Sequence, residues 1–408
     1  MSLCLLTEGT YPYHVGGVST WTHALLQGLS DVPVLLVPLY AGPTPGAPLW
    51  DLPAHVTLHS PLRVPDTLAP EAIDNWCRTV APTLPAMDLV HALTAGVAGQ
   101  LGRRLQADRT LPFLVTEHGI GWHELRHGAG ETETGYRPAG AAPCFADAAL
   151  ARAVDDLQHH ARAVYAVADA ITTVAWANQE KQYALGADPA RCHVLPNGVA
   201  VPEYPPDDPT GPFHVGLVGR VTPLKDIVTF LHACAHVHEA LPSARFSVVG
   251  PPSDPAYAAR CHTLAHRLGL TNAVTFVENA RTMSSWYRRF HAVALTSRSE
   301  AQPLALLEAM AQARPVVATD VGDCRRLIDG PDDDLGSAGG VCPVGDAHAF
   351  ADALLALARE PARGRTRGQV GWTRVRRSYQ RDASIAAYRR LYHFLRSSKP
   401  VASASSYA

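Results

Sequence analysis

Apolar and polar positions follow two patterns along the chain. Short apolar runs are separated by longer segments in which apolar residues recur at helical spacing. In the first half the runs are 3–7, 34–37, 89–93, 113–116 and 171–174. In the second half they are 214–218, 246–249, 274–277, 292–296, 316–319 and 340–343. Short strands that alternate with helices are typical of parallel sheets covered by helices, so the pattern predicts an α/β protein with two such sheets.

A proline-dense stretch at 201–212 separates the two series of runs. Proline cannot continue a helix or a central strand, so we expect a linker there. A chain of 408 residues is also longer than a single hydrophobic core usually organises. The predicted domains are 1–204 and 205–375, followed by a C-terminal helix at 376–397 and a loose tail at 398–408.

Composition narrows the class of protein. The chain has 35 Lys and Arg against 37 Asp and Glu, a net charge of −2, so no broad basic field favours a nucleic-acid partner. Eight cysteines are scattered without a C-x-x-C pair, which predicts reduced, packed thiols rather than a zinc knuckle or a disulfide scaffold. Because no apolar run would cross a bilayer or serve as a signal peptide, we expect a cytoplasmic protein without a transmembrane segment.

The segment after the run 292–296 carries the strongest chemical signal. Glu300 would lie at the carboxyl end of that strand, where open α/β sheets bind their ligands. Pro303 suits the first turn of a helix, whose N-terminal amides and dipole favour a phosphate or a sugar. The amides that would face such a ligand are those of Ala301, Gln302 and Leu304.

Glu308 falls on the face of that helix that should be buried. It shares the helical spacing of Leu304, Leu307 and Ala311. Burial of an unpaired carboxylate is costly, so Glu308 needs a partner or a ligand, and the two hydroxyls of a ribose would serve. The alternative, which periodicity leaves equally open, is that Glu308 lies at the edge of the stripe or pairs with an arginine.

Two further turns between a strand and a helix are candidates for phosphate binding. Arg220 and Lys225 bracket a turn after the run 214–218 and would point at one diphosphate. Taken alone, Lys225 is more often a solvated residue at a helix start. Gly16 and Gly17 precede a helix after the first strand and would allow close backbone approach to a phosphate. Taken alone, such a pair more often marks a plain tight turn.

Together these residues resemble retaining family 4 glycosyltransferases. Glu300 and Glu308 reproduce the family's E-x7-E signature, and Gly219, Arg220 and Lys225 resemble its diphosphate clamp. The opening segment 5–21 and the sequence TEHG at 116–119 resemble the PelF-type branch, which is associated with exopolysaccharide synthesis and UDP-glucose. The segment PNGV at 196–199 and Gly322 also fit the superfamily.

The resemblance implies a GT-B fold, in which two Rossmann-like domains face each other across a cleft and the C-terminal helices cross back to the N-terminal domain. It implies that 1–204 is the acceptor-side domain and that 205–375 binds the nucleotide-sugar donor. It implies that Glu308 holds the ribose and that Arg220 and Lys225 hold the diphosphate. Glu300 and His118 would contact the donor sugar. Gly16 and Gly17 would close on the phosphates from the N-terminal domain.

The activity implied is transfer of a hexose, with retention, from a UDP-sugar, UDP-glucose or a related one, to a glycan or small-molecule acceptor. No metal or other cofactor is required if Arg220, Lys225 and a helix N-terminus stabilise the leaving diphosphate. Association with a membrane glycan-synthesis complex is a further expectation. A GT-B nucleotide-sugar epimerase and a non-catalytic nucleotide-sugar-binding subunit are the alternatives.

A more remote alternative is a zinc metallopeptidase. Residues 123–127 read HELRH, which fits the H-E-x-x-H pattern of two histidines one helical turn apart. The chain has 20 histidines, so a chance match is unsurprising. Gly119, Gly121, Gly128 and Gly130 around the motif also disfavour a long helix.

Overall fold

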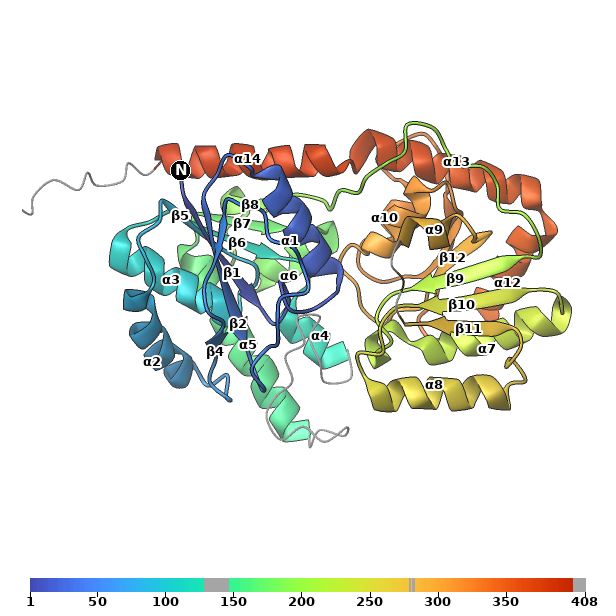
Figure 1. Cartoon of the computed structure of the whole chain (residues 1–408), viewed down its shortest axis with the longest axis horizontal. Coiled ribbons are helices and arrows are strands. Elements are labelled where there is room, and N and C mark those ends of the chain that lie inside the picture. Colours follow the sequence, from blue (N-terminus) through green and yellow to red (C-terminus); the bar gives the residue numbers. More distant parts are fainter. Residues whose placement is uncertain (128–146, 279, 281–282, 399–408) are drawn as a thin grey trace, which may run out of the picture. The chain divides into compact units, whose positions relative to one another are not determined.

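A computed structural model of the chain describes residues 1–127, 147–278, 280 and 283–398. The chain divides into two units, one of Met1–Pro196 with the chain from Asp382 onward and the other of Asn197–Arg381. Each unit is a parallel sheet with helices on its faces (Figure 1). No helix in the described ranges is long and apolar enough to cross a membrane.

The sheet of the first unit has the strand order β3-β2-β1-β5-β6-β7-β8, and β4 pairs with β2. Its strands are β1 (Leu3–Glu8), β2 (Val34–Tyr40), β3 (Val56–Leu58), β4 (Leu62–Arg63), β5 (Leu89–Ala92), β6 (Phe113–Glu117), β7 (Ala170–Thr173) and β8 (Cys192–Val194). Its helices are α1 (Gly17–Gly28), α2 (Pro70–Val80), α3 (Val97–Arg109), α4 (Gly121–His127), α5 (Asp147–Val167), α6 (Trp176–Ala184) and α14 (Arg381–Ser398). The five predicted runs became β1, β2, β5, β6 and β7. The prediction missed β3, β4 and β8, which are too short to show an apolar pattern.

The sheet of the second unit has the order β11-β10-β9-β12-β13-β14. Its strands are β9 (His214–Val218), β10 (Arg245–Val249), β11 (Val274–Val277), β12 (Ala292–Leu295), β13 (Val316–Thr319) and β14 (Gly339–Cys342). Its helices are α7 (Ile227–Ala240), α8 (Pro255–Arg267), α9 (Met283–Tyr287), α10 (Leu304–Ala311), α11 (Cys324–Asp329), α12 (Ala347–Arg359) and α13 (Pro361–Ser378). All six predicted runs are strands, and their pairing is parallel throughout.

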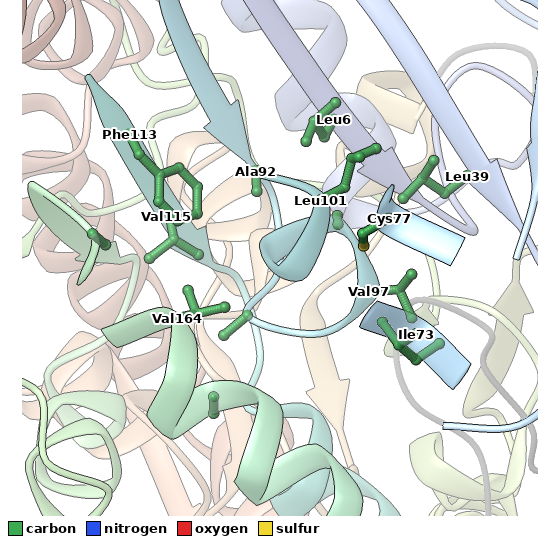
Figure 2. Packing of buried hydrophobic residues seen from close by; sticks show 14 of the residues in the cluster. Leu6, Leu39, Ile73, Cys77, Ala92, Val97, Leu101, Phe113, Val115 and Val164 are labelled. Atoms are coloured by element: carbon green, nitrogen blue, oxygen red, sulfur yellow. The ribbon is translucent and has the colours of Figure 1, made fainter. Parts of the chain in front are cut away.

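The core of the first unit lies between the sheet and the helices α3 and α5. Leu6, Ala92 and Val115 project from three neighbouring strands toward Leu101 of α3 and Val164 of α5 (Figure 2). All five side chains are fully buried. Because residues alternate between the two faces of a strand, the intervening positions serve a second layer on the opposite face of the sheet.

The last helix, α14, belongs to the first unit. Tyr388 and Tyr392 are buried in the same cluster as Trp21 and Leu25 of α1. The hydroxyl of Tyr392 lies 2.9 Å from Nδ1 of His91 on β5. The helix expected over 376–397 corresponds to α14, which begins at Arg381, whereas residues 376–378 are the end of α13. The tail expected at 398–408 lies outside the described residues except for Ser398, which ends α14.

The first boundary between the units falls after Pro196, earlier than the proline-dense stretch. Val199 donates its amide to the Tyr379 carbonyl at 2.9 Å and accepts from the Arg381 amide at 3.0 Å. A Cβ at Gly198 would lie 2.5 Å from the carbonyl oxygen of Gln380. These backbone contacts tie 197–199 to the end of the second unit, and the sequence pattern did not show this pairing.

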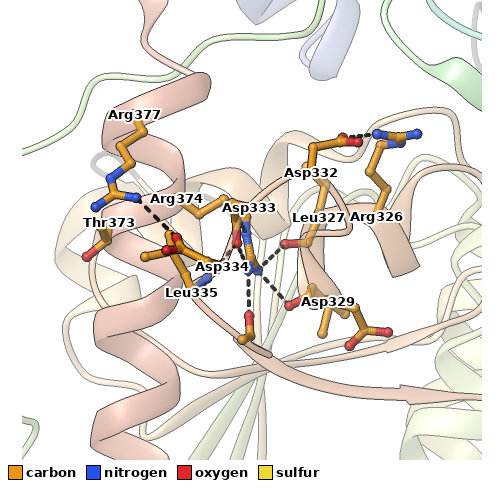
Figure 3. Close-up of polar contacts among 12 residues, drawn as sticks. Arg326, Leu327, Asp329, Asp332, Asp333, Asp334, Leu335, Thr373, Arg374 and Arg377 are labelled. Carbon is orange, nitrogen blue, oxygen red and sulfur yellow. Dashed lines mark hydrogen bonds and ion pairs between the residues drawn. The ribbon is translucent and has the colours of Figure 1, made fainter.

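Arg374 anchors α13 within the second unit (Figure 3). Its side chain is 2% exposed, and its guanidinium donates to both oxygens of Asp333, at 2.6 and 2.9 Å. It also donates to the carbonyls of Leu327 and Ile328 near the end of α11. The last carbonyls of a helix have no partner within the helix, and a cation there is favourable. The anchored α13 packs on α10 so closely that a Cβ at Gly371 would lie 3.0 Å from Met310 Cγ.

The cysteines of the described ranges are free and buried. Burial raises the pKa of thiols such as Cys4 and Cys77, each to about 12. These residues are therefore packed thiols, as predicted, and their protonated form suits an apolar interior. Cys144 lies outside the described residues.

Candidate functional site

The two loops with the residues predicted to bind a nucleotide-sugar lie at one edge of the second sheet. β9 and β12 are hydrogen-bonded neighbours and run parallel. The loop after β9, with Arg220 and Lys225, is therefore next to the loop after β12, with Glu300. This is the carboxyl edge of the strands, where ligands of open α/β sheets bind.

Lys225 and Glu300 are in direct contact at this edge. Lys225 Nζ lies 2.6 Å from Glu300 Oε1, and the two side chains are 15% and 5% exposed. Two hydrogen bonds to backbone carbonyls fix both loops: the Thr296 hydroxyl donates to the Lys225 carbonyl at 2.9 Å, and the Arg298 amide donates to the Leu224 carbonyl at 2.9 Å. The structure thus brings together two residues that sequence reasoning assigned to separate segments.

Asp226 fixes the start of α7 immediately after Lys225. It adopts a left-handed backbone with φ of 45° and accepts from the Thr229 amide and, at 2.9 Å, from the Thr229 hydroxyl. Arg298 Nε lies 3.2 Å from Asp226 Oδ2. Sequence reasoning missed both residues, although an Asp just before an apolar helical pattern is a recognised signal for a helix N-cap.

Two glycines allow tight backbone packing around these loops. Gly322 has a φ of +52°, and a Cβ there would lie 2.2 Å from the Glu300 carbonyl oxygen and 2.4 Å from that of Ala301. Gly250 has a φ of +152°, and a Cβ there would lie 2.1 Å from the Gly219 carbonyl oxygen. Both positions therefore require glycine on two counts, conformation and space. Sequence reasoning missed Gly250, which directly follows the strand β10.

Glu308 lies on α10 and is half-buried. The Tyr287 hydroxyl donates to its Oε2 at 2.8 Å. Burial raises the pKa of Glu308, while the Tyr287 hydrogen bond and the charge of Arg381 oppose that rise. The structure supplies the partner that the sequence required, and it is a tyrosine hydroxyl with an arginine charge in support.

The start of α10 differs by one position from the expectation. Pro303 is the N-cap residue, with extended backbone, and the helix begins at Leu304. The residue before a helix takes a non-helical conformation while its carbonyl accepts the first helical bonds, and the Pro303 carbonyl accepts from the Leu306 amide at 3.1 Å. Whether the amides of Ala301, Gln302 and Leu304 bind a ligand stays a prediction.

Asn197 donates two hydrogen bonds to Gln302. The Asn197 amide donates to Gln302 Oε1 at 2.6 Å, and Asn197 Nδ2 donates to the Gln302 carbonyl at 2.9 Å. Both side chains are buried. The Gln302 side chain thus holds the loop after β12 against the segment 197–199.

The remaining predicted site residues, Gly16, Gly17 and His118, lie in the first unit. Gly16 is the N-cap of α1 and Gly17 is its first residue, and both are half-buried. His118 follows β6 and is buried, with its ring centroid 4.4 Å from that of Trp21. Burial lowers the pKa of His118 to about 3, so its imidazole is neutral at physiological pH. Their grouping with Glu300, Arg220 and Lys225 stays a prediction.

The first unit has its own pocket, which sequence reasoning did not predict. It is lined by Glu8, Thr94, Glu117, His118 and Glu124, with apolar residues beside them. Glu8 and Glu117 each end a strand. A carboxylate that directly follows an apolar strand was the signal available in the sequence.

The H-E-x-x-H motif lies on α4, the short helix Gly121–His127. Glu124 is buried, and its Oε1 lies 1.7 Å from the position that a Cβ at Gly119 would take. Within the described residues no group of three or more His, Cys, Asp or Glu side chains is arranged to hold a metal ion. The His127 side chain is outside the described part, and metal independence stays a prediction.

Two protein families match the chain, one in each half. Residues 212–360 match the family described as Glycosyl transferases group 1. Residues 1–64 and 71–190 match a family described as a domain of unknown function, DUF3492. The domain with Lys225, Glu300 and Glu308 is thus the one with the glycosyltransferase match.

Curated relatives match about half of the chain. The D-inositol 3-phosphate glycosyltransferase of Kribbella flavida is 30% identical over 230 residues, which are 50% of this chain and 52% of that protein. The protein of the same name from Frankia alni is 34% identical over 233 residues, 49% of this chain and 56% of that protein. The chain therefore spans about half the length of the curated relatives it matches.

Solved structures match nearly the whole chain. Sucrose-phosphate synthase from Thermosynechococcus elongatus has a TM-score of 0.77 at 20% identity and covers 98% of this chain, with 100% of its own chain matched. HepE of Anabaena, solved in complex with UDP-glucose, has a TM-score of 0.71 at 17% identity, and the match covers 97% and 100% of the two chains. These likenesses show the fold, which is the predicted GT-B fold with two Rossmann-like domains.

Proposed function

We propose that the protein is a GT-B glycosyltransferase that moves a hexose from a nucleotide-sugar to a glycan or small-molecule acceptor, with retention at the anomeric carbon. The observation that carries the proposal is the contact between Lys225 and Glu300 at the carboxyl edge of the second sheet. This edge belongs to the segment that matches Glycosyl transferases group 1. The names of the relatives, D-inositol 3-phosphate glycosyltransferases, support the class of reaction.

The donor is proposed to be a UDP-sugar, with UDP-glucose first. HepE, whose fold this chain shares, was solved with that compound. Glu308 would bind the ribose, because the Tyr287 hydroxyl holds Oε2 and orients the carboxylate. A carboxylate can accept hydrogen bonds from both hydroxyls of a ribose. Glu300 and His118 would contact the hexose, and Gly16 and Gly17 would approach the phosphates.

Charge is the basis of the proposed mechanism. Cleavage of the bond between sugar and phosphate leaves a diphosphate with increasing negative charge and a sugar with oxocarbenium character. Arg220 and Lys225 would stabilise the diphosphate, because preorganised cations interact most strongly where charge develops in the transition state. The ammonium of Lys225 has three protons, so it can contact Glu300 and a phosphate together. The acceptor would attack from the face that the diphosphate leaves, and the leaving phosphate would take its proton.

In this proposal no metal or other cofactor takes part, because Arg220, Lys225 and the N-terminus of α10 would stabilise the charge of the diphosphate. We place the protein in the cytoplasm, in exopolysaccharide or related glycan synthesis, with a membrane glycan-synthesis complex as its working partner. The resemblance of its N-terminal motifs to PelF-type enzymes supports this placement.

The first test is nucleotide binding by the full chain. Thermal unfolding is followed with UDP, GDP, ADP and their glucose conjugates, because a ligand that binds only the folded state raises Tm as its concentration rises. We expect UDP and UDP-glucose to stabilise the protein and Glu308→Gln to weaken that effect. Glu239→Gln, an exposed carboxylate on α7, is the matched control.

The second test concerns the reaction itself. Donor is incubated with a panel of acceptors, released nucleoside diphosphate is measured, and NMR reads the anomeric configuration of the product. Epimerised donor without released diphosphate would indicate an isomerase. Tight nucleotide binding without any turnover would indicate a binding subunit, and stabilisation by zinc alone would return attention to His123 and His127.

A further inference from the structure

A second pocket lies at the amino edge of the second sheet, opposite the loops that follow β9 and β12. The strands β10, β9 and β12 are neighbours and run parallel. His214 and Arg245 begin β9 and β10, and Arg288 and Arg289 lie between α9 and β12. These four residues line a cavity of about 760 Å³, which is within the size range of small-molecule sites. We call this cavity the arginine pocket.

The proline-dense stretch forms the other wall of the arginine pocket. Residues between 202 and 212 line the cavity, and the stretch follows α13 (Figure 1). Trp372 Nε1 on α13 donates to the Pro202 carbonyl at 3.3 Å. Arg314, which is 2% exposed, donates to the Asp207 carbonyl at 2.7 Å. Because each proline also fixes its own φ angle, this wall has a defined shape.

Each arginine of the pocket is held by a neutral group. Arg245 Nη1 donates at 2.9 Å to two carbonyls of the loop before β10. Arg288 Nε donates to Gln312 Oε1 at 3.3 Å. The guanidinium carbon of Arg289 lies 4.8 Å from the centre of the Trp286 ring, whose face attracts a cation. Among the residues that the structure describes, no carboxylate forms an ion pair with any of the three guanidiniums.

The two aspartates of the pocket leave an excess of positive charge. Asp207 and Asp208 both line the cavity. Asp208 Oδ2 lies 3.6 Å from Arg365 Nε on α13, so its charge is matched by a fourth arginine. Three guanidiniums therefore remain against the single carboxylate of Asp207.

His214 is affected by this positive charge. Burial lowers its pKa to about 4, and the charges of His291, Arg289 and Arg245 contribute to the same shift. Its imidazole is therefore neutral at physiological pH, and its Nε2 lies 2.9 Å from Ser247 Oγ. The pKa shift supports the conclusion from the geometry that the pocket favours a negative charge.

We propose that the arginine pocket binds a small organic phosphate, such as a sugar phosphate. The planar guanidinium of arginine matches the oxygens of a phosphate, and a phosphate monoester carries close to two negative charges at neutral pH. Tyr204, which is 74% exposed, and the prolines around it supply apolar surface for the rest of the molecule. This site lies at the opposite edge of the sheet from the proposed donor site, and it does not depend on that proposal.

The same residues connect the pocket to Glu308. Arg288 directly follows Tyr287, whose hydroxyl donates to Glu308 Oε2 at 2.8 Å. Gln312, the partner of Arg288, follows α10 and donates its amide to the Glu308 carbonyl at 3.2 Å. A phosphate that binds Arg288 should therefore change the affinity for UDP, and UDP should change the affinity for the phosphate by the same factor. This consequence rests on the proposed function, because it requires Glu308 to bind the nucleotide.

The test compares ribose 5-phosphate with ribose and with inorganic phosphate. Each is titrated calorimetrically into the full chain, with saturating UDP present to occupy a phosphate site at the other edge of the sheet. We expect ribose 5-phosphate to bind at least about tenfold more tightly than either of the other two. Arg245→Gln and Arg289→Gln should each weaken its binding about fivefold, since each removes one cation from the pocket. Arg267→Gln, a change at an exposed arginine at the end of α8, is the matched control.

Three results would overturn the site: no saturable binding of ribose 5-phosphate, equal binding of ribose, or Arg245 and Arg289 variants that behave like the control. Vesicles of phosphatidylcholine with phosphatidic acid test the lipid source of the same chemistry. Binding to these vesicles that is lost in the two variants, without binding of ribose 5-phosphate, would assign the arginines to a membrane surface instead.

The affinity for UDP is measured in parallel, with and without ribose 5-phosphate. An unchanged UDP affinity would reject the connection through Arg288. A parent protein that binds ribose 5-phosphate but not UDP would reject the proposed donor site and leave the arginine pocket in place. A protein that binds UDP but not ribose 5-phosphate would reject the arginine pocket alone.

Discussion

Lys225 Nζ and Glu300 Oε1 lie 2.6 Å apart, although 75 residues separate them in the chain. Both side chains are largely withdrawn from solvent. Removal of one partner from such a pair leaves the other charge buried and unpaired, which is commonly more costly than the loss of both. The contact therefore couples the stability of the two loops to the chemistry proposed for them.

The coupling is testable by a double-mutant cycle. Lys225→Met and Glu300→Gln should each lower Tm, with a cost of about 3 kcal/mol when Glu300 is left unpaired. The double variant should recover part of that loss, since no charge remains buried without a partner. Thermal unfolding of the four proteins checks this, and strictly additive effects would show that the two side chains do not interact.

Tyr287 should control the pH range over which the nucleotide binds. Two ribose hydroxyls require an ionised Glu308, so nucleotide affinity should fall as the pH falls through the pKa of Glu308. The Tyr287 hydrogen bond lowers that pKa against the effect of burial. In Tyr287→Phe the pKa should rise further, and the loss of affinity should begin at a higher pH than in the parent.

Calorimetric titration of UDP at a series of pH values measures this. Tyr257→Phe, a change at another buried tyrosine of the second unit, controls for a general loss of stability on removal of a buried hydroxyl. Identical pH profiles in the parent and Tyr287→Phe would remove the role assigned to the hydroxyl.

Glu117 should make the protein less stable as the pH rises. Burial raises the pKa of Glu117 from 4.5 to about 7, so between these values the folded chain binds a proton that the unfolded chain has lost. The contribution of Glu117 to the free energy of unfolding is fully present below pH 4.5 and is lost as the pH rises to about 7. The total loss is about 3 kcal/mol. Glu117→Gln should flatten the difference between Tm at pH 5 and at pH 8, and an unchanged difference would contradict the assignment.

Gly322→Ala should impair donor binding more than its backbone strain alone explains. A Cβ at this position would lie 2.2 Å from the Glu300 carbonyl oxygen, so the loop that carries Glu300 must move. Gly345→Ala is the matched control, since Gly345 has a φ of +78° with no atom within 4 Å of the added carbon. Both variants should lose about 1 kcal/mol from the left-handed backbone, and only Gly322→Ala should also weaken UDP binding.

The sequence by itself determined the architecture of each half. Apolar runs such as 214–218 and 292–296 became strands because burial on both faces requires consecutive apolar residues. The positions of Glu300 and Glu308 relative to a strand and a helix also followed from local spacing. Strands of two or three residues, such as β4 (Leu62–Arg63), were missed because their pairing comes from neighbours and not from their own pattern.

Only the tertiary structure decided which residues meet. The order of strands in a parallel sheet depends on the crossovers between them, so the sequence could not show that the loops after β9 and β12 are neighbours. For the same reason the contact of Tyr287 with Glu308, and the gathering of Glu8 and Glu117 in one pocket, were hidden. Each depends on side chains far apart in the chain, whereas periodicity reports only the residues within a few turns.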